Sequence, residues 1–313
     1  MLAQIQNEYP EAVRIVYRHF PLVSIHDKAA LSAQAAEAAG RQGQFWEMHD
    51  LLFERQAEWA QMSVEDFQAW LLDQAEALGL DSERFSADLV SEEIVDYVQG
   101  TWDRGVEINL PGTPYLLIDG QIWPQSLPMS PENIRAIVEL KLLEEKQFTT
   151  CPPMTIDPSR QYIATLETEK GDIVIELYPD KAPVAVNNFI FLAENDWYDG
   201  VTFHRVLADF VAQGGDPSGT GFGGPGYAFI NETSDLTFDK PGVLAMANSG
   251  PDSNGSQFFI TYAPAEQLNG GYTIFGQVIS GLDVAESLTP RDPSQSVNLA
   301  PGDMILNVTI EEK

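Results

Sequence analysis

Two blocks of the sequence carry the side chains best suited to chemistry. The first, at 203–227, places Arg205, two phenylalanines and a glutamine within eleven residues and ends in a run of glycines. The second, at 242–261, adds asparagine, glutamine and two more phenylalanines. Arginine is permanently charged and presents several N–H donors, while the rings offer an apolar surface. Such a set favours non-covalent stabilisation of a bound polar group, which requires no nucleophile, general base or metal.

The letters of these blocks, FHRVLADFVAQGGDPSGTGFGGPGY and GVLAMANSGPDSNGSQFFIT, resemble the two halves of a cyclophilin active site. They occur in the order and spacing of that family, and the likeness extends from about residue 161 to the C-terminus. Cyclophilins are peptidyl-prolyl cis-trans isomerases with a mainly-β closed barrel. The resemblance therefore implies that fold and that activity here, with no cofactor and no metal.

The residue roles follow from what such catalysis requires. An X–Pro amide resists rotation by about 18–20 kcal/mol because its nitrogen lone pair is delocalised into the carbonyl. A catalyst must favour the twisted amide, whose lone pair is localised on nitrogen. We expect Arg205 to donate to that nitrogen, with Phe210 and Gln213 completing the catalytic group. The expected substrate-binding residues line the proline pocket or hold the flanking backbone: Val211, Ala247, Asn248, Gln257, Phe259, Leu268 and Tyr272.

Three positions depart from the family pattern. Val211 stands where the family usually has methionine, and Tyr272 stands where eukaryotic members usually have histidine. Gln267 replaces the usual tryptophan that helps to bind cyclosporin, which predicts weak inhibition by that drug.

His204 is adjacent to Arg205, and neighbouring strand residues point to opposite faces. If Arg205 faces the groove, His204 therefore faces the core.

Three functions compete at this point. The first is an active isomerase. The second is a proline-peptide-binding chaperone module without turnover, against which the intact Arg205 argues. The third is a bifunctional disulfide oxidoreductase and isomerase, which requires cysteines upstream of Met1.

The elements that position these residues can be predicted from periodicity. Residues 162–168 and 172–177 alternate apolar and polar side chains across a Lys-Gly turn, the signature of a hairpin. A helix is expected at 182–195 and another near 282. Many short strands with two helices favour a closed β-barrel. Further short strands are expected at 201–205, 210–214, 242–247, 257–261, 273–279 and 304–310.

The N-terminal half predicts a different fold. Its order is a helix at 1–9, a strand at 12–20, a helix-rich insertion, a strand within 111–120, and a helix opened by Pro131. The stretches YRHFPL, AAEAAGRQGQFWEMHDLLF and GTPYLLIDG are similar to the thioredoxin-like α/β fold of the DsbA family. That likeness implies a cis peptide bond before Pro114.

This half departs from the DsbA pattern in one respect. The family's first strand and C-x-x-C motif should precede the first helix, yet the chain begins at that helix and contains no C-x-x-C. We expect either a truncated reading of a longer protein or a domain that now serves as a scaffold or peptide-binding surface. An extracytoplasmic location is expected if a signal or anchor precedes Met1, and a cytoplasmic one if the chain is complete.

Composition sets the remaining limits. We expect a DsbA-like domain at 1–146, a proline-rich linker at 147–160 and an isomerase domain at 161–313. The net charge of −30 argues against nucleic acid as a partner, and no apolar run is long enough for membrane insertion. Cys151 is the single cysteine, so no intrachain disulfide can form. The expected partners are proline-containing segments of client proteins; the oligomeric state stays open. The remaining histidines lack metal-ligand spacing: His19, His26 and His49.

Overall fold

The computed structural model describes residues 1–124, 126–295 and 299–313. The chain divides into two compact units, one formed by residues 15–127 and the other by residues 1–14 together with 128–313.

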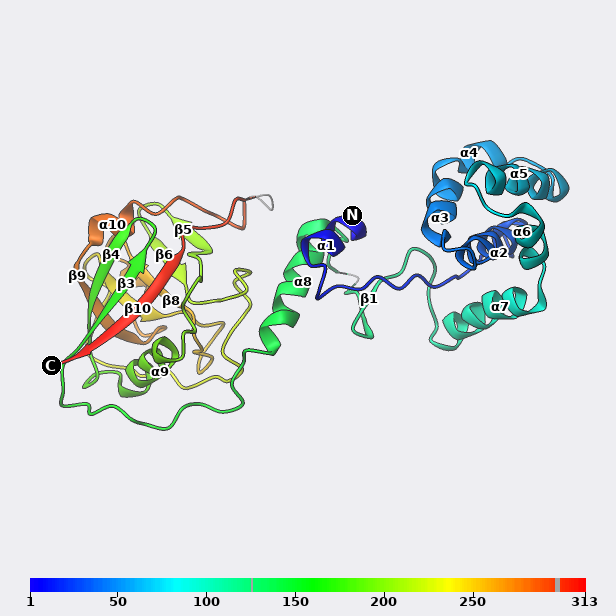
Figure 1. Cartoon of the computed structure of the whole chain (residues 1–313). Helices are drawn as coiled ribbons and strands as arrows, with labels where there is room; N and C mark the ends of the chain where they lie inside the picture. The colour runs from blue at the N-terminus through cyan, green and yellow to red at the C-terminus, as the bar shows by residue number, and fades with distance from the viewer. Residues whose placement is uncertain (125, 296–298) are drawn as a thin grey trace. The chain divides into compact units, whose positions relative to one another are not determined.

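The unit at 15–127 is mainly helical, and its helices are drawn in blue to cyan (Figure 1). The first helix of this unit, α2 (Ala29–Gly40), is rich in buried alanines, which let the neighbouring helices pack close to it. Larger side chains such as Phe67 and Phe85 fill the buried core that results. Ser63 accepts a hydrogen bond from the Asp66 amide and starts one helix; Gly79, at a φ of +75°, follows its end. The elements are α2 (Ala29–Gly40), α3 (Phe45–Glu54), α4 (Gln56–Trp59), α5 (Val64–Ala77), α6 (Ser82–Leu89), α7 (Glu92–Glu107), β1 (Leu117–Ile118) and β2 (Gln121–Ile122).

The strand expected at 12–20 does not form. Residue 12 belongs to a turn, and residues 13–20 pair with no strand in the described part of the chain. Tyr17 and His19 are nevertheless more buried than Val16 and Arg18, as the alternation predicts. His19 bonds the Glu37 carboxylate at 2.9 Å, and the Tyr17 ring packs among aromatic side chains of α3. Alternation reports which side chains are buried but cannot supply a partner strand, so side-chain contacts hold this segment instead. The Thr113–Pro114 peptide bond is cis.

Two helices from the N-terminal half belong to the second unit. They are α1 (Leu2–Glu8) and α8 (Pro131–Glu144), which lie side by side (Figure 1). Arg135 of α8 forms an ion pair with Glu8 at 2.8 Å. Ser130 caps α8 and Pro131 occupies its first turn, as the sequence predicts.

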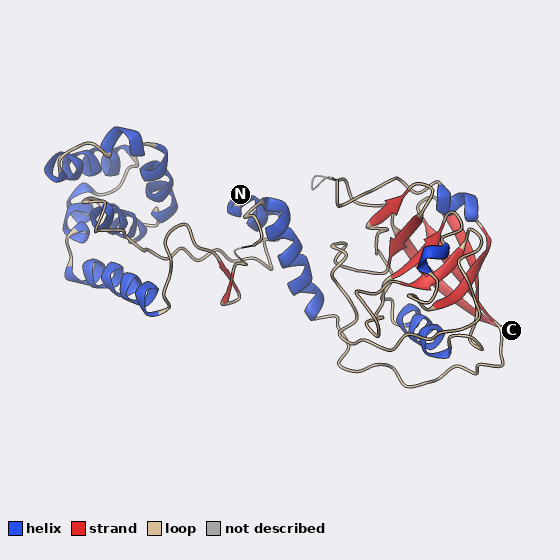
Figure 2. Ribbon diagram, turned by 180° about the vertical axis from the view of Figure 1, so that it is seen from behind, coloured by secondary structure: helices blue, strands red, loops and turns tan. Residues whose placement is uncertain are grey.

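Within the described residues, the rest of this unit is built on one antiparallel sheet of eight strands (Figure 2). Their order is β10-β3-β4-β9-β7-β8-β6-β5. The strands are β3 (Tyr162–Thr168), β4 (Gly171–Leu177), β5 (Arg205–Leu207), β6 (Val211–Gly214), β7 (Val243–Met246), β8 (Phe258–Thr261), β9 (Ile274–Ser280) and β10 (Ile305–Glu312). The helices are α9 (Pro183–Glu194), the 3₁₀ turn η1 (Glu266–Leu268) and α10 (Leu282–Glu286).

The sheet curls, but its closure is only approximate. The edge strands β5 and β10 do not pair as a ladder. Instead, the Phe203 amide donates to the Asp303 carbonyl at 3.0 Å, and the Ile305 amide donates to the Val201 carbonyl at 2.8 Å. This bridge occupies residues that the sequence assigns to a strand at 201–205, so β5 starts later, at Arg205.

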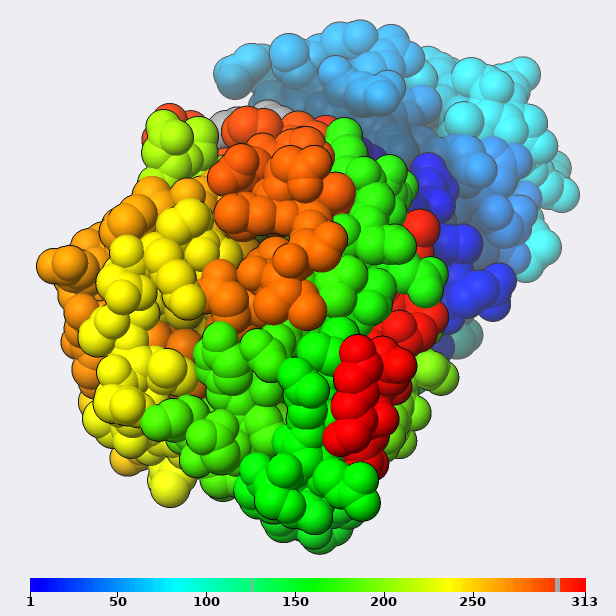
Figure 3. All heavy atoms as spheres, turned by 90° about the vertical axis from the view of Figure 1, so that its left-hand side faces the viewer, coloured from blue at the N-terminus to red at the C-terminus, as the bar shows by residue number. Residues whose placement is uncertain are grey.

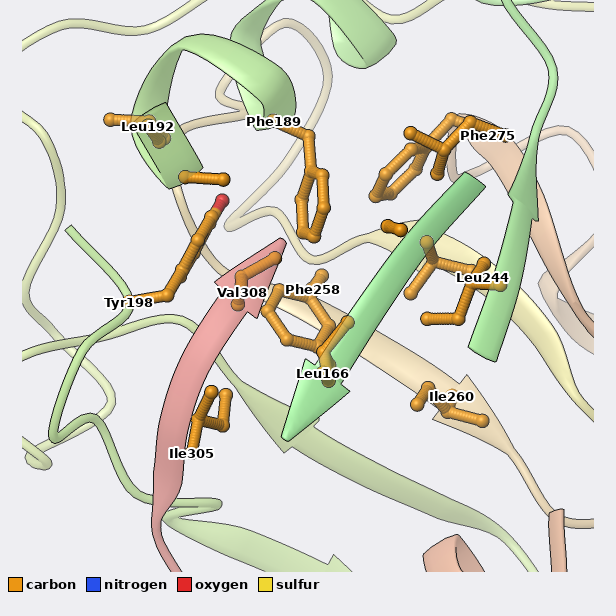
Figure 4. Close-up of a cluster of buried hydrophobic side chains, with 14 of the residues drawn as sticks. Leu166, Phe189, Leu192, Tyr198, Leu244, Phe258, Ile260, Phe275, Ile305 and Val308 are labelled. Atoms are coloured by element: carbon orange, nitrogen blue, oxygen red, sulfur yellow. The ribbon is translucent and has the colours of Figure 1, made fainter. Parts of the chain in front are cut away.

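The inside of the curled sheet holds a core of aromatic and aliphatic side chains (Figure 4). The Phe189 ring of α9 lies 5.0 Å from Tyr198 and 5.7 Å from Phe258, measured between centroids. Leu244 and Ile260 point into the same core from β7 and β8 (Figure 4). In the space-filling view, the red C-terminal residues lie directly against green ones, consistent with the pairing of β10 with β3 (Figure 3).

Candidate active site

Strand register gathers the expected site residues on the outer face of the sheet. Arg205 of β5 lies opposite Gln213 of β6, and Gln213 lies opposite Phe259 of β8. Phe259 in turn lies opposite Ala245 of β7. Directly opposed residues share one face, and their sequence neighbours, such as Ala212, are buried in the inner core. A continuous outer row results, polar at β5 and β6 and apolar at β8 and β7.

Side-chain amides fix the polar end of this row. Arg205 Nη1 donates to Gln213 Oε1 at 3.5 Å, and Gln213 Nε2 donates to Gln257 Oε1 at 3.0 Å. Gln257 Nε2 then donates to the carbonyl oxygens of Gly221 and Gly223 at 3.0 and 2.8 Å. Each amide is therefore held in one orientation, with the Gln213 oxygen turned toward the guanidinium.

The apolar end is a second hydrophobic cluster, separate from the inner core. The Arg205 guanidinium lies 6.0 Å from the centroid of the Phe210 ring, beside this cluster. The Phe259 and Tyr272 rings meet edge to face at 5.3 Å. The structure thus brings together the expected apolar residues: Phe210, Val211, Ala247, Phe259, Leu268 and Tyr272.

Sequence reasoning missed several members of this cluster, among them Phe238 and Ala245. Phe238 is fully buried and stacks on Phe259 with 5.8 Å between centroids. Ala245 lies opposite Phe259 on β7. Phe238 sits in a loop without periodicity, so no spacing pattern marks it, whereas Ala245 lies two residues before Ala247 in the expected strand at 242–247 and therefore on the same face.

Asn248 and Ala247 form the rim after β7. Asn248 Nδ2 donates to the Gly271 carbonyl at 3.1 Å, and its Oδ1 accepts from the Gly250 amide at 3.2 Å. The Ala247 amide donates to the Gln257 carbonyl at 2.9 Å. The asparagine is therefore held beside the loop that carries Tyr272, next to the apolar cluster.

A glycine-rich loop at 216–224 borders the polar end and depends on Asp216, which sequence reasoning also missed. This carboxylate is fully buried and accepts from the amides of Ser218, Gly221 and Gly223 at 2.7–3.0 Å. A Cβ at Gly223 would lie 2.0 Å from Asp216 Oδ1, so only glycine fits. An aspartate that opens a glycine run is the local signal that could have identified this turn.

His204 is buried, with 3% of its surface exposed, as its position next to Arg205 predicts. Burial lowers its pKa to about 4; the charges of Arg291 and Arg205 act in the same direction, and Asp216 opposes them. Neither ring nitrogen has a hydrogen-bond partner among the described residues. The imidazole is therefore neutral at pH 7 and faces away from the outer row.

The described ranges contain no group of three or more histidine, cysteine, aspartate or glutamate side chains placed to hold a metal ion. In the same ranges, none of the helices combines the length and apolar character needed to cross a membrane.

Comparison with known families separates the two halves of the chain. Residues 163–310 match the model of the cyclophilin-type peptidyl-prolyl cis-trans isomerases, and residues 1–140 match a thioredoxin model. The fold and the outer row thus define a cyclophilin domain that follows a thioredoxin-like domain.

Individual relatives match part of the chain. The chain is 54% identical over 127 residues to the peptidyl-prolyl cis-trans isomerase ppi1 of Schizosaccharomyces pombe, covering 39% of this chain and 82% of that protein. It is 48% identical over 145 residues to peptidyl-prolyl cis-trans isomerase A of Mycobacterium tuberculosis, covering 41% and 80%. A solved cyclophilin-type isomerase of Cryptosporidium parvum is 37% identical, with a TM-score of 0.45, covering 49% of this chain and 99% of that one. The chain belongs to the cyclophilin-type peptidyl-prolyl cis-trans isomerase family.

Proposed function

We propose that this chain catalyses the cis–trans isomerisation of X–Pro bonds in protein substrates and so assists their folding. The single observation that supports this most directly is the outer row, in which Arg205 lies opposite Gln213 and beside an apolar cluster that contains Phe259. The substrates are proline-containing peptide segments.

The mechanism is non-covalent. As the amide twists, its nitrogen gains a localised lone pair, and Arg205 donates a hydrogen bond to it. The cation is fixed before the reaction by Gln213 and by the Phe210 ring, so little reorganisation is needed in the transition state. Because the untwisted amide nitrogen is a poor acceptor, this bond favours the transition state over the ground state.

The remaining residues bind the substrate on either side of that nitrogen. The proline ring occupies the apolar cluster, while Gln213 and Asn248 hold the flanking backbone and Gln257 supports Gln213. In keeping with the two family models, we assign the thioredoxin-like domain to 1–146, the connecting segment to 147–160 and the isomerase domain to 161–313. Pro114 serves a structural role in the thioredoxin-like domain.

The test is a chromogenic proline-peptide assay on the full chain and on Arg205→Ala. Removing one preorganised donor should lower kcat/KM by about a hundredfold or more. Arg160→Ala is the matched control, because this arginine is exposed in the same half and should leave the rate unchanged. Equal rates at the uncatalysed level for the full chain and Arg205→Ala would refute the proposal. If a peptide still binds without exchange broadening of its NMR signals, the chain is a binding module without turnover.

A further inference from the structure

Residues that precede the cyclophilin match at 163–310 pack directly onto its glycine-rich loop. Leu143, near the end of α8, is 4% exposed and belongs to the core of the isomerase half. Gln147 Nε2 donates to the Gly224 carbonyl at 2.9 Å. The Phe148 amide donates to the Pro225 carbonyl, also at 2.9 Å. We call Leu143, Gln147 and Phe148 the clasp.

The aromatic ring of Phe148 anchors the clasp. It lies 4.9 Å from Phe191 of α9 and 5.9 Å from Trp197, between centroids. Trp197 Nε1 donates to the Gly215 carbonyl at 3.3 Å, immediately before the glycine-rich loop. The clasp therefore reaches both ends of that loop, at Gly215 through Trp197 and at Pro225 directly.

Two glycines show how closely the clasp and the loop approach. A Cβ at Gly226 would lie 2.3 Å from the Phe148 carbonyl oxygen, and one at Gly223 would lie 2.7 Å from Leu143 Cδ2. At Gly226 the contact is with backbone, so a side chain there would require the backbone to move, whereas at Gly223 the Leu143 side chain itself would have to shift. The loop sequence thus leaves room for the clasp, which lies outside the family match.

The same loop also contacts the expected active-site residues. The carbonyls of Gly221 and Gly223 accept from Gln257, which orients Gln213 and through it Arg205. We propose that the clasp is a positioning element for the isomerase reaction: it holds the glycine-rich loop so that these two carbonyls fix the Gln257–Gln213–Arg205 chain. This inference rests on the proposed function.

The loop needs such support because of its composition. Gly219 and Gly221 have φ values of +65° and +82°, which glycine adopts without strain but does not favour over other conformations. Ordering each residue of a flexible loop costs about 1–2 kcal/mol of conformational entropy. Asp216 accepts from the Gly221 and Gly223 amides, and the clasp donates to the next carbonyls along the chain, those of Gly224 and Pro225.

The test uses point variants of the full chain. Gln147→Glu keeps the shape of the side chain but replaces the donor to Gly224 with an acceptor. Loss of one hydrogen bond should lower kcat by about fivefold with little change in KM. Gln147→Lys retains a donor and should restore most of the rate. The matched control is Thr149→Ala, an exposed neighbour that should leave the rate unchanged.

Two readouts separate positioning from general stability. If the clasp acts through Gln257, adding Gln147→Glu to Gln257→Ala should lower kcat no further than Gln257→Ala alone. Amide hydrogen exchange at Gly221 and Gly223 should accelerate by about tenfold or more in Gln147→Glu, while the amides of β4 keep their rates. Phe148→Ala should accelerate the same loop amides, and Phe148→Leu should do so less.

Several outcomes would overturn the inference. The first is that Gln147→Glu and Phe148→Leu both keep the kcat of the unmodified chain and the same amide exchange rate at Gly221. A fully additive effect with Gln257→Ala is another, since it would mean that the clasp acts by a different route. If the unmodified chain does not isomerise proline peptides, the proposed function fails. Loop exchange then decides separately whether the clasp holds the loop.

Discussion

Replacing His204 by leucine should change how the stability of the isomerase half depends on pH. Burial holds the pKa of His204 at about 4 in the folded chain, against 6.5 for an ordinary histidine. Between these values the unfolded chain binds a proton on His204 that the folded chain does not, so unfolding becomes easier as the pH falls. From those two pKa values the loss approaches about 3 kcal/mol in full, of which about 2 kcal/mol is present at pH 5.

The assay is urea unfolding at pH 7 and pH 5, followed by the NMR signal of the Met246 methyl group in the isomerase core. His204→Leu should lose about 2 kcal/mol less than the unmodified chain between these two pH values. Acidic residues that do not interact with His204 contribute equally to both chains, so their effect cancels; Asp216, whose charge raises the pKa of His204, is the exception. At pH 7 the two stabilities should be similar, because neither ring nitrogen has a partner among the described residues. Parallel pH dependence in the two chains would show that His204 is not held neutral by burial.

Two further predictions concern other parts of the isomerase half. Gln267→Trp should tighten inhibition by cyclosporin about fivefold, since Gln267 is exposed beside Leu268 of the apolar cluster and one aromatic contact contributes about 1 kcal/mol. Equal inhibition constants in an enzymatic titration would refute this. Glu232→Ala should lower the free energy of unfolding by about 1–3 kcal/mol, because the Glu232 carboxylate accepts the Val184 and Ala185 amides at the start of α9. Glu232→Gln keeps an acceptor and should cost less, and identical losses in the two variants, compared by urea unfolding, would contradict this assignment.

Local patterns of the isomerase half translated well into structure. The alternation at 162–168 and 172–177 lies within β3 and β4, whose side chains pack on one inner core. The same reasoning was wrong at 12–20, where the alternation is present but the backbone is unpaired. Periodicity encodes which face is buried, whereas ladder formation depends on a neighbour elsewhere in the chain. Among the described residues, none provides such a neighbour for that segment.

The site residues also divide into those that the sequence could identify and those that it could not. Side chains within continuous motifs, such as Arg205 and Gln213, could be identified because their strand spacing fixes their common face. Phe238 and Asp216 could not be assigned in the same way, since their positions depend on loop paths and on contacts made across the sheet. The orientation of the Gln257 amide is likewise set by two loop carbonyls rather than by its own strand.

The segment at 147–160 shows that a proline-rich composition is compatible with close contacts to the neighbouring domain. The prolines at 152, 153 and 158 favour an extended chain, which reads as a linker, but extension does not imply independence. Asn187 of α9 donates to the Pro153 carbonyl and accepts from the Thr155 amide at 2.7 Å, which holds this segment against the isomerase half. An extended chain leaves its backbone groups free for such bonds. A proline-rich composition therefore suits a segment that is bound along a domain, here residues 152–158, which we call the strap, as well as it suits a free spacer. Because the strap follows Phe148 of the clasp closely along the chain, changes in it should affect the Gln257–Gln213–Arg205 chain before they affect the core.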